Sequence, residues 1–191
     1  PWSNNSGTKN SNTSISGGEG NDYAYVNYHK TASLQGDGGD DLLSTYGVQF
    51  STLNGGAGSD QLSASINNEN TYYTSGDSSA AVQAVLDGGE GNDTLNINGT
   101  AYKWSGRVDV TADGGAGNDE ITITASRAGN TQLSGNDYGF ASVAVDSGDG
   151  ADTIRVSGGL QVNITTGAGS DTVELTAQQY RTILELSLIH I

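Results

Sequence analysis

The sequence predicts an all-β fold, a right-handed parallel β-roll or β-solenoid in which short two-strand coils stack along one axis. Three observations predict it. A six-residue glycine and aspartate block recurs seven times, apolar residues alternate at period two on both sides of each block, and the shortest block spacing is 19 residues. A coil this short cannot bury its apolar side alone, so successive coils must stack on one another.

The repeated block reads GGEGND at 17–22, GDGGDD at 36–41, GGAGSD at 55–60, GGEGND at 88–93, GGAGND at 114–119, SGDGAD at 147–152 and TGAGSD at 166–171. With the block numbered 1 to 6, glycine holds position 4 and aspartate holds position 6 in all seven. The departures are Asp37 at position 2, and Ser147 and Thr166 at position 1. Glycine suits such a turn because it adopts positive φ without steric cost and lets backbone carbonyls crowd together.

The segments on either side of each block predict strands, so each coil reads as strand, glycine turn, strand. Apolar residues recur at every second position, as in 94–97, 120–123, 153–156 and 172–175 after the blocks. Stacking would place them in two internal files. One file is Leu43, Leu62, Leu95, Ile121, Ile154 and Val173, and the other is Ile15, Leu34, Leu53, Leu86, Ala112, Val145 and Ile164.

From aspartate to aspartate, the steps between blocks are 19, 19, 33, 26, 33 and 19 residues, so three coils carry 14, 7 and 14 extra residues. The strand alternation places these additions opposite the blocks, on what we call the far edge, as loops at about 65–81, 98–107 and 124–140. Their aromatic side chains could stack on a sugar or anchor a protein, or they could simply cover the open flank of the core. The candidate ligand-binding residues are Tyr72, Tyr73, Tyr102, Trp104 and Tyr138.

Composition excludes several classes of function. Acidic residues outnumber basic ones by 22 to 7, and the net charge of −15 disfavours binding to nucleic acid or anionic lipid. No apolar run approaches the roughly 20 residues that a membrane helix needs. Cysteine is absent, which excludes disulfides and thiolate metal sites. Because only 34% of the chain is hydrophobic and 29 residues are glycine, a single large core is not expected.

Stacking at a strand spacing of about 4.8 Å puts the seven position-6 aspartates in one row, along what we call the block edge. Like charges in such a row repel one another unless a cation lies between them. Calcium fits best, because it takes about six to eight oxygen ligands in flexible geometry and a glycine turn offers carbonyl oxygens beside the carboxylate. Magnesium demands tighter octahedral geometry, and zinc prefers cysteine and histidine. The alternative is that the blocks are ordinary turns without metal.

The blocks resemble the nonapeptide GGxGxDxUx of repeats-in-toxin (RTX) proteins, over residues 15 to about 176. The resemblance implies calcium ions between neighbouring turns, held by position-6 carboxylates and by carbonyls of positions 1 and 3. The implied carboxylates are Asp22, Asp41, Asp60, Asp93, Asp119, Asp152 and Asp171, and the implied carbonyls include Gly55, Ala57, Gly88, Glu90, Gly114 and Ala116. Seven turns leave about six gaps for Ca²⁺, and six ions would change the formal charge from −15 to about −3. Because the blocks occupy one edge only, the chain is more similar to the one-row coils of some large RTX adhesins.

The two ends lack the repeat. Residues 1–14 are polar and unpatterned and are interpreted as a linker or the frayed end of an earlier coil, before a solenoid over 15–185. The last six residues, LSLIHI at 186–191, match the translation of a sequencing-library adapter. We therefore expect a metagenomic fragment of a longer protein.

The expected function is that of a calcium-binding structural repeat of a large secreted bacterial protein, which folds on binding calcium after type I secretion and acts outside the cell or at its surface. One alternative is an adhesin-type module that recognises polysaccharide or a surface protein through the far-edge aromatics. Another is the C-terminal part of an exported RTX enzyme. No catalytic set is expected in these residues, and His29 is interpreted as an exposed turn residue. Neither nucleic acid nor membrane insertion is expected.

Overall fold

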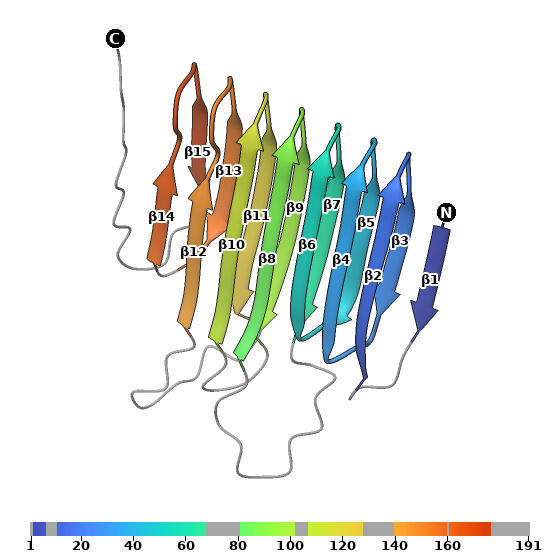
Figure 1. Cartoon of the computed structure of the whole chain (residues 1–191). Helices are drawn as coiled ribbons and strands as arrows, with labels where there is room; N and C mark the ends of the chain where they lie inside the picture. The colour runs from blue at the N-terminus through green and yellow to red at the C-terminus, as the bar shows by residue number, and fades with distance from the viewer. Residues whose placement is uncertain are drawn as a thin grey trace, which may run out of the picture.

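The computed structural model describes residues 2–6, 11–67, 81–101, 107–127, 140–159 and 161–176. These residues form 15 strands in two parallel sheets that lie face to face (Figure 1). They contain no helix, and so none long and apolar enough to cross a membrane. The predicted all-β parallel β-solenoid is confirmed.

Each coil contributes one strand to each sheet, because even-numbered strands form one sheet and odd-numbered strands the other, both in chain order. The even sheet contains β2 (Asn12–Glu19), β4 (Thr31–Gly38), β6 (Phe50–Ala57), β8 (Ala81–Glu90), β10 (Arg107–Ala116), β12 (Phe140–Asp146) and β14 (Gln161–Thr165). The odd sheet contains β1 (Trp2–Ser6), β3 (Tyr23–Asn27), β5 (Leu42–Val48), β7 (Gln61–Asn67), β9 (Thr94–Ala101), β11 (Glu120–Arg127), β13 (Thr153–Gly158) and β15 (Thr172–Thr176). The seven blocks form the tight connections from each even strand to the next odd strand, and we number coils 1 to 7 by their blocks.

In-register pairing stacks the apolar side chains inside the coils as predicted. Leu43, Leu62, Leu95, Ile121, Ile154 and Val173 are paired one after another across the odd sheet. Ile15, Leu34, Leu53, Leu86, Ala112, Val145 and Ile164 are paired in the same way across the even sheet. All are buried except Ile15 and Val173, which are partly buried because they lie in the first and last coils. Both predicted files are confirmed.

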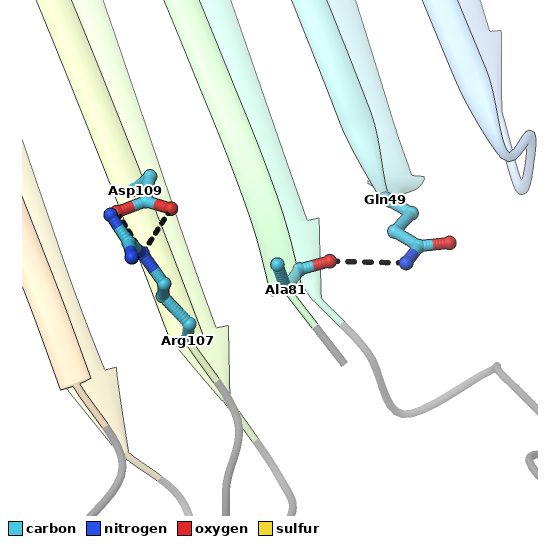
Figure 2. Close-up of polar contacts among 4 residues, drawn as sticks. All are labelled: Gln49, Ala81, Arg107 and Asp109. Carbon is cyan, nitrogen blue, oxygen red and sulfur yellow. Dashed lines mark hydrogen bonds and ion pairs between the residues drawn. The ribbon is translucent and has the colours of Figure 1, made fainter. Parts of the chain in front are cut away.

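The strands run further into the far edge than the sequence predicts. β7 ends at Asn67 and β9 at Ala101, so the predicted boundaries at 65 and 98 are wrong by a few residues. The same holds at 124, because β11 continues to Arg127. Buried Ile66 and Ala125 explain the difference, since each keeps its segment in the strand beyond the predicted end. Gln49 closes part of this edge by donating from Nε2 to the Ala81 carbonyl oxygen at 3.0 Å (Figure 2).

The candidate ligand-binding aromatics fall outside the described residues. Tyr72, Tyr73, Tyr102, Trp104 and Tyr138 all belong to 68–80, 102–106 and 128–139, which lie between the described ranges. The proposed adapter segment 186–191 also lies outside them.

The N-terminal polar segment contributes to the solenoid. β1 pairs with β3 in parallel, and β2 begins at Asn12, before the predicted start of the solenoid at residue 15. Strand pairing uses backbone groups, and the polar side chains of an edge strand can face solvent, so the absence of apolar alternation did not exclude a strand here.

His29 is buried, with only 4% of its surface exposed, so its interpretation as an exposed residue was wrong. It lies in the short turn between β3 and β4, after Tyr28, whose φ is +58°. Its Nδ1 lies 2.7 Å from Thr13 Oγ1, and burial lowers the pKa of the imidazole. Even a three-residue turn has an inward-facing position, and here that position holds a histidine.

The internal files carry the apolar stability of the fold. We expect Leu95→Ala to lower the free energy of unfolding by about 2–5 kcal/mol, because Leu95 is fully buried between Leu62 and Ile121. Leu42→Ala is the matched control, since Leu42 is 38% exposed, and should cost about 0.5 kcal/mol or less. Urea unfolding at saturating calcium, followed by circular dichroism, measures both. Equal losses would contradict the assignment of the core.

Candidate metal-binding edge

The position-6 aspartates point into the turns rather than toward solvent. Each occupies the same alternating set of buried positions as the inward-facing residues of the strand that follows it, as Asp93 does with Leu95 and Ile97. Six of the seven are buried, with 1–5% of their surface exposed: Asp22, Asp41, Asp60, Asp93, Asp119 and Asp152. Asp171, in the last coil, is only partly buried. The blocks therefore form a row of internal carboxylates along one edge.

One oxygen of every carboxylate after Asp22 is fixed by the coil before it. The backbone N–H of each position-6 aspartate from Asp22 to Asp152 donates to Oδ1 of the position-6 aspartate in the next coil. The N···Oδ1 distances are 2.7 Å for 22–41, 41–60 and 60–93, 2.8 Å for 93–119, 2.9 Å for 119–152 and 3.1 Å for 152–171. These bonds link all seven coils through one side-chain ladder.

Position 5 carries a second ladder that the sequence analysis missed. Its side-chain oxygen accepts from the backbone N–H of position 5 in the following coil, so this ladder runs opposite to the first. The bonds are Asp40 N to Asn21 Oδ1, Ser59 N to Asp40 Oδ1, Asn92 N to Ser59 Oγ, Asn118 N to Asn92 Oδ1 and Ala151 N to Asn118 Oδ1, at 2.8–3.3 Å. The signal was present, because six of the seven position-5 residues are Asn, Asp or Ser, which are short side chains with an acceptor oxygen.

The other carboxylate oxygen is left without a partner. Oδ2 of Asp41, Asp60, Asp93, Asp119 and Asp152 is buried and accepts no hydrogen bond. Arg107 precedes the fifth block in the sequence, but it lies at the opposite end of β10 from that block. Its guanidinium group is paired with Asp109 (Figure 2). A buried carboxylate oxygen without a donor or a counter-charge is costly. These five atoms are therefore suited to contact with a bound cation.

Glycine at position 1 leaves a space beside these oxygens. A Cβ added to Gly88 would lie 2.5 Å from Asp93 Oδ2 and 2.5 Å from the carbonyl oxygen of Gly114 in the next coil. At Gly114 the corresponding atoms are Asp119 Oδ2 and the Ser147 carbonyl oxygen, both at 2.6 Å. We call this volume the position-1 space. Because these glycines do not have positive φ, the missing side chain, and not backbone freedom, is what the site requires.

Positive φ is required at positions 2 and 4 instead. Position-4 glycines such as Gly91 (+131°) and Gly117 (+138°) all adopt it, as the sequence predicts. At position 2, Asp37 is the exception because it is not glycine, yet it also adopts positive φ, at +77°. Its carboxylate accepts hydrogen bonds from Ser16 Oγ and from Gln35 Nε2, which offset part of that strain.

The carbonyls that the resemblance implies as ligands fall into two groups. Those of Gly55, Gly88 and Gly114 border the position-1 spaces of the coils before them. Those of Ala57, Glu90 and Ala116 each accept a backbone N–H from the position-4 glycine of the preceding coil, at 2.8 Å. A carbonyl oxygen has a second lone pair, so this bond does not prevent it from also binding a cation.

Burial makes the ionised row unfavourable when no cation is bound. Burial, more than any neighbouring charge, raises the pKa of Asp93 to about 6, and Asp119 and Asp60 add to the effect while the Asp60 N–H opposes it. Burial also raises the pKa of Asp41, Asp60, Asp119 and Asp152. Near neutral pH the row therefore favours either protons or a bound cation.

The donor set of this edge fits calcium. Within the described ranges, no three histidine, aspartate or glutamate side chains converge as metal ligands. Each gap between coils instead offers a carboxylate together with backbone carbonyl oxygens. Such all-oxygen sets rich in carbonyls suit calcium, whereas zinc would require nitrogen or sulfur ligands.

The raised pKa values predict an unusual pH dependence for the calcium-free protein. A carboxyl group whose pKa rises from 3.8 to about 6 on folding stabilises the fold fully below about pH 4, and this contribution is lost as the pH rises through 6. We therefore expect the β-sheet circular dichroism signal of the calcium-free protein to be larger at about pH 4.5 than at about pH 7. Asp93→Asn should weaken this dependence. A calcium-free β-sheet signal that rises with pH would contradict the burial of the row.

Comparison with protein-family models, with curated proteins and with solved structures finds no match. The resemblance to RTX repeats therefore depends on the seven blocks alone, and the function proposed below depends on the geometry of the block edge.

Proposed function

We propose that this chain is a calcium-dependent structural module, in which ions bound between the coils of the block edge hold the solenoid together. The observation that carries the proposal is the set of buried, unpartnered Oδ2 atoms of Asp41, Asp60, Asp93 and Asp119, each beside a position-1 space bordered by a carbonyl oxygen of the next coil.

Electrostatics explains why the ion would determine folding. Two carboxylates one strand spacing apart repel each other by about 3 kcal/mol at an effective dielectric constant of about 20. Such a repulsion acts between each pair of neighbouring coils, and is comparable in sum to the total stability of an ordinary domain. A divalent cation in each gap replaces repulsion with attraction, so its binding free energy becomes folding free energy.

This dependence suits a protein that folds only after export. Where calcium is scarce, the charged row and the entropy of 29 glycines favour the unfolded chain, which can pass through a type I secretion channel. Extracellular calcium, at about millimolar concentration, can fill weak sites of this kind. The folded solenoid would then act as a rigid, stabilising part of a larger secreted protein.

Calcium titration of the calcium-free chain, followed by far-UV circular dichroism near pH 7, tests the proposal. We expect the β-sheet signal to develop with calcium and to be absent in chelator. A chelated sample that keeps its full β-sheet signal would overturn the proposal.

Two adjacent residues supply a matched pair for the same titration. Asp41→Asn removes the charge of a buried carboxylate but keeps an oxygen that can accept from Asp22 N–H. It should raise the calcium concentration at half-folding about tenfold, equivalent to about 1.4 kcal/mol. Asp40→Asn makes the same charge change at an exposed position and keeps the acceptor for Ser59 N–H, so it should change the midpoint little.

A second candidate function is recognition of a polysaccharide, and one observation favours it. Among the residues whose side chains the structure describes, the exposed large hydrophobic ones gather in coils 1 and 2: Tyr23, Tyr28, Leu42 and Tyr46. The rings of Tyr28 and Tyr46 lie edge to face, 5.7 Å apart. Tyrosine rings with their hydroxyl groups in water can stack on the faces of sugars.

A glycan array on the calcium-loaded protein separates this candidate from a passive structural role. If this surface binds sugar, Tyr46→Ala should reduce binding about tenfold, a loss of about 1.4 kcal/mol. Asn96→Ala, an exposed change on β9 of the same sheet, serves as the control and should leave binding unchanged. No binding by the wild-type protein would exclude this candidate.

A further inference from the structure

The six gaps between the seven coils are not equivalent. In the first five, position 1 of the earlier coil is glycine and leaves a position-1 space: Gly17, Gly36, Gly55, Gly88 and Gly114. In each of these gaps an added Cβ would lie close to Oδ2 of the same coil's aspartate and to the position-1 carbonyl oxygen of the next coil. In the sixth gap, position 1 is Ser147, which has the Cβ that the other five lack.

The side chain of Ser147 occupies this space and interacts with the groups that border it. Ser147 is fully buried, and its Oγ donates to the Thr166 carbonyl oxygen at 3.1 Å. That carbonyl corresponds to the Gly114 carbonyl that borders the space beside Gly88. Asp152 Oδ2 is buried and accepts no hydrogen bond, as in the other gaps, so this gap differs from them in the space beside the carboxylate and not in the carboxylate itself. A hydroxyl group thus stands where the other gaps leave room for a cation.

The carboxylate ladder has its longest bond at the same place. The N···Oδ1 distance is 2.7 Å between the first four coils, 2.8 Å and 2.9 Å in the next two gaps, and 3.1 Å from Asp152 to Asp171. Asp171 is also only partly buried, unlike the six aspartates before it. In the last coil, position 1 is again not glycine but Thr166, which is buried. The last gap is therefore distinguished from the others by the side chain of Ser147 and by the partial exposure of Asp171.

We propose that the calcium row has five sites, and that Ser147 closes the sixth gap with a neutral hydroxyl in place of an ion. This inference rests on the proposed function, because it concerns the number and position of the same ions. It differs from the expectation of about six, which followed from counting turns without regard to position 1. Five ions would bring the formal charge from −15 to −5, the sum of −15 and five times +2.

Equilibrium dialysis of the full chain against radioactive calcium, at saturation and fixed ionic strength, measures the number of bound ions. The wild type should bind five, Ser147→Gly should bind six because it opens the last position-1 space, and Gly88→Ser should bind four because it fills one. Gly88 does not have positive φ, so serine suits its backbone dihedral angles, but the Gly114 carbonyl oxygen, 2.5 Å from the added Cβ, must shift.

Ser147→Ala separates a blocking side chain from a ligating one. If Cβ excludes the ion, this variant binds five ions like the wild type. If the hydroxyl is itself a calcium ligand, the wild type binds six and Ser147→Ala binds fewer, which overturns the inference.

The outcomes also separate this inference from the proposed function. Six ions on the wild type, or no gain in Ser147→Gly, overturn the inference alone. No bound calcium on any variant overturns the inference together with the calcium-dependent module. Should Gly88→Ser fail to fold, the comparison of the wild type with Ser147→Gly and Ser147→Ala still decides between five sites and six.

Discussion

A carboxylate that points into each turn is the constraint on which the rest of this structure depends. Oδ1 of every position-6 aspartate after Asp22 accepts a backbone N–H from the coil before it, while Oδ2 of Asp41, Asp60, Asp93, Asp119 and Asp152 is left without a partner. The other positions of the block follow from this arrangement. Position 1 is small because the carboxylate needs its space, positions 2 and 4 adopt positive φ to close the turn, and position 5 supplies a second acceptor.

Two ladders of opposite direction fix the spacing and register of the coils. Position 6 accepts from the preceding coil and position 5 accepts from the following one, so a shift of one residue would break both sets of bonds. It would also turn the apolar files outward, because strand side chains alternate between the two faces. Register therefore does not depend on apolar packing alone, which is consistent with a core made partly of small residues such as Ala84 and Ala112.

The seven blocks and their apolar flanks were sufficient to predict the coils, both internal files and the row of carboxylates. These features repeat, and repetition turns weak local preferences into a consistent pattern. The misses concern single positions. The prediction that His29 is exposed is wrong because nothing in the sequence of a three-residue turn shows which residue faces inward. Position 5 was overlooked because Asn, Asp and Ser are also ordinary turn residues, so their type alone did not reveal a ladder. Ser147 was noted only as a departure, because its meaning depends on atoms of two neighbouring coils.

The block edge also explains why the far edge can vary in length. The step from Asp60 to Asp93 contains 14 residues more than the basic coil, yet Leu53 pairs with Leu86 and Leu62 with Leu95, so the sheets on both sides stay in register. By contrast, the pairing of β5 with β7 shifts by one residue between Tyr46 and Val48, at the far edge. Irregularity is thus tolerated where no ladder runs and absent where two ladders run. The additions can change in length and sequence without disturbing the carboxylate row, because the row, and not the loops, aligns the coils.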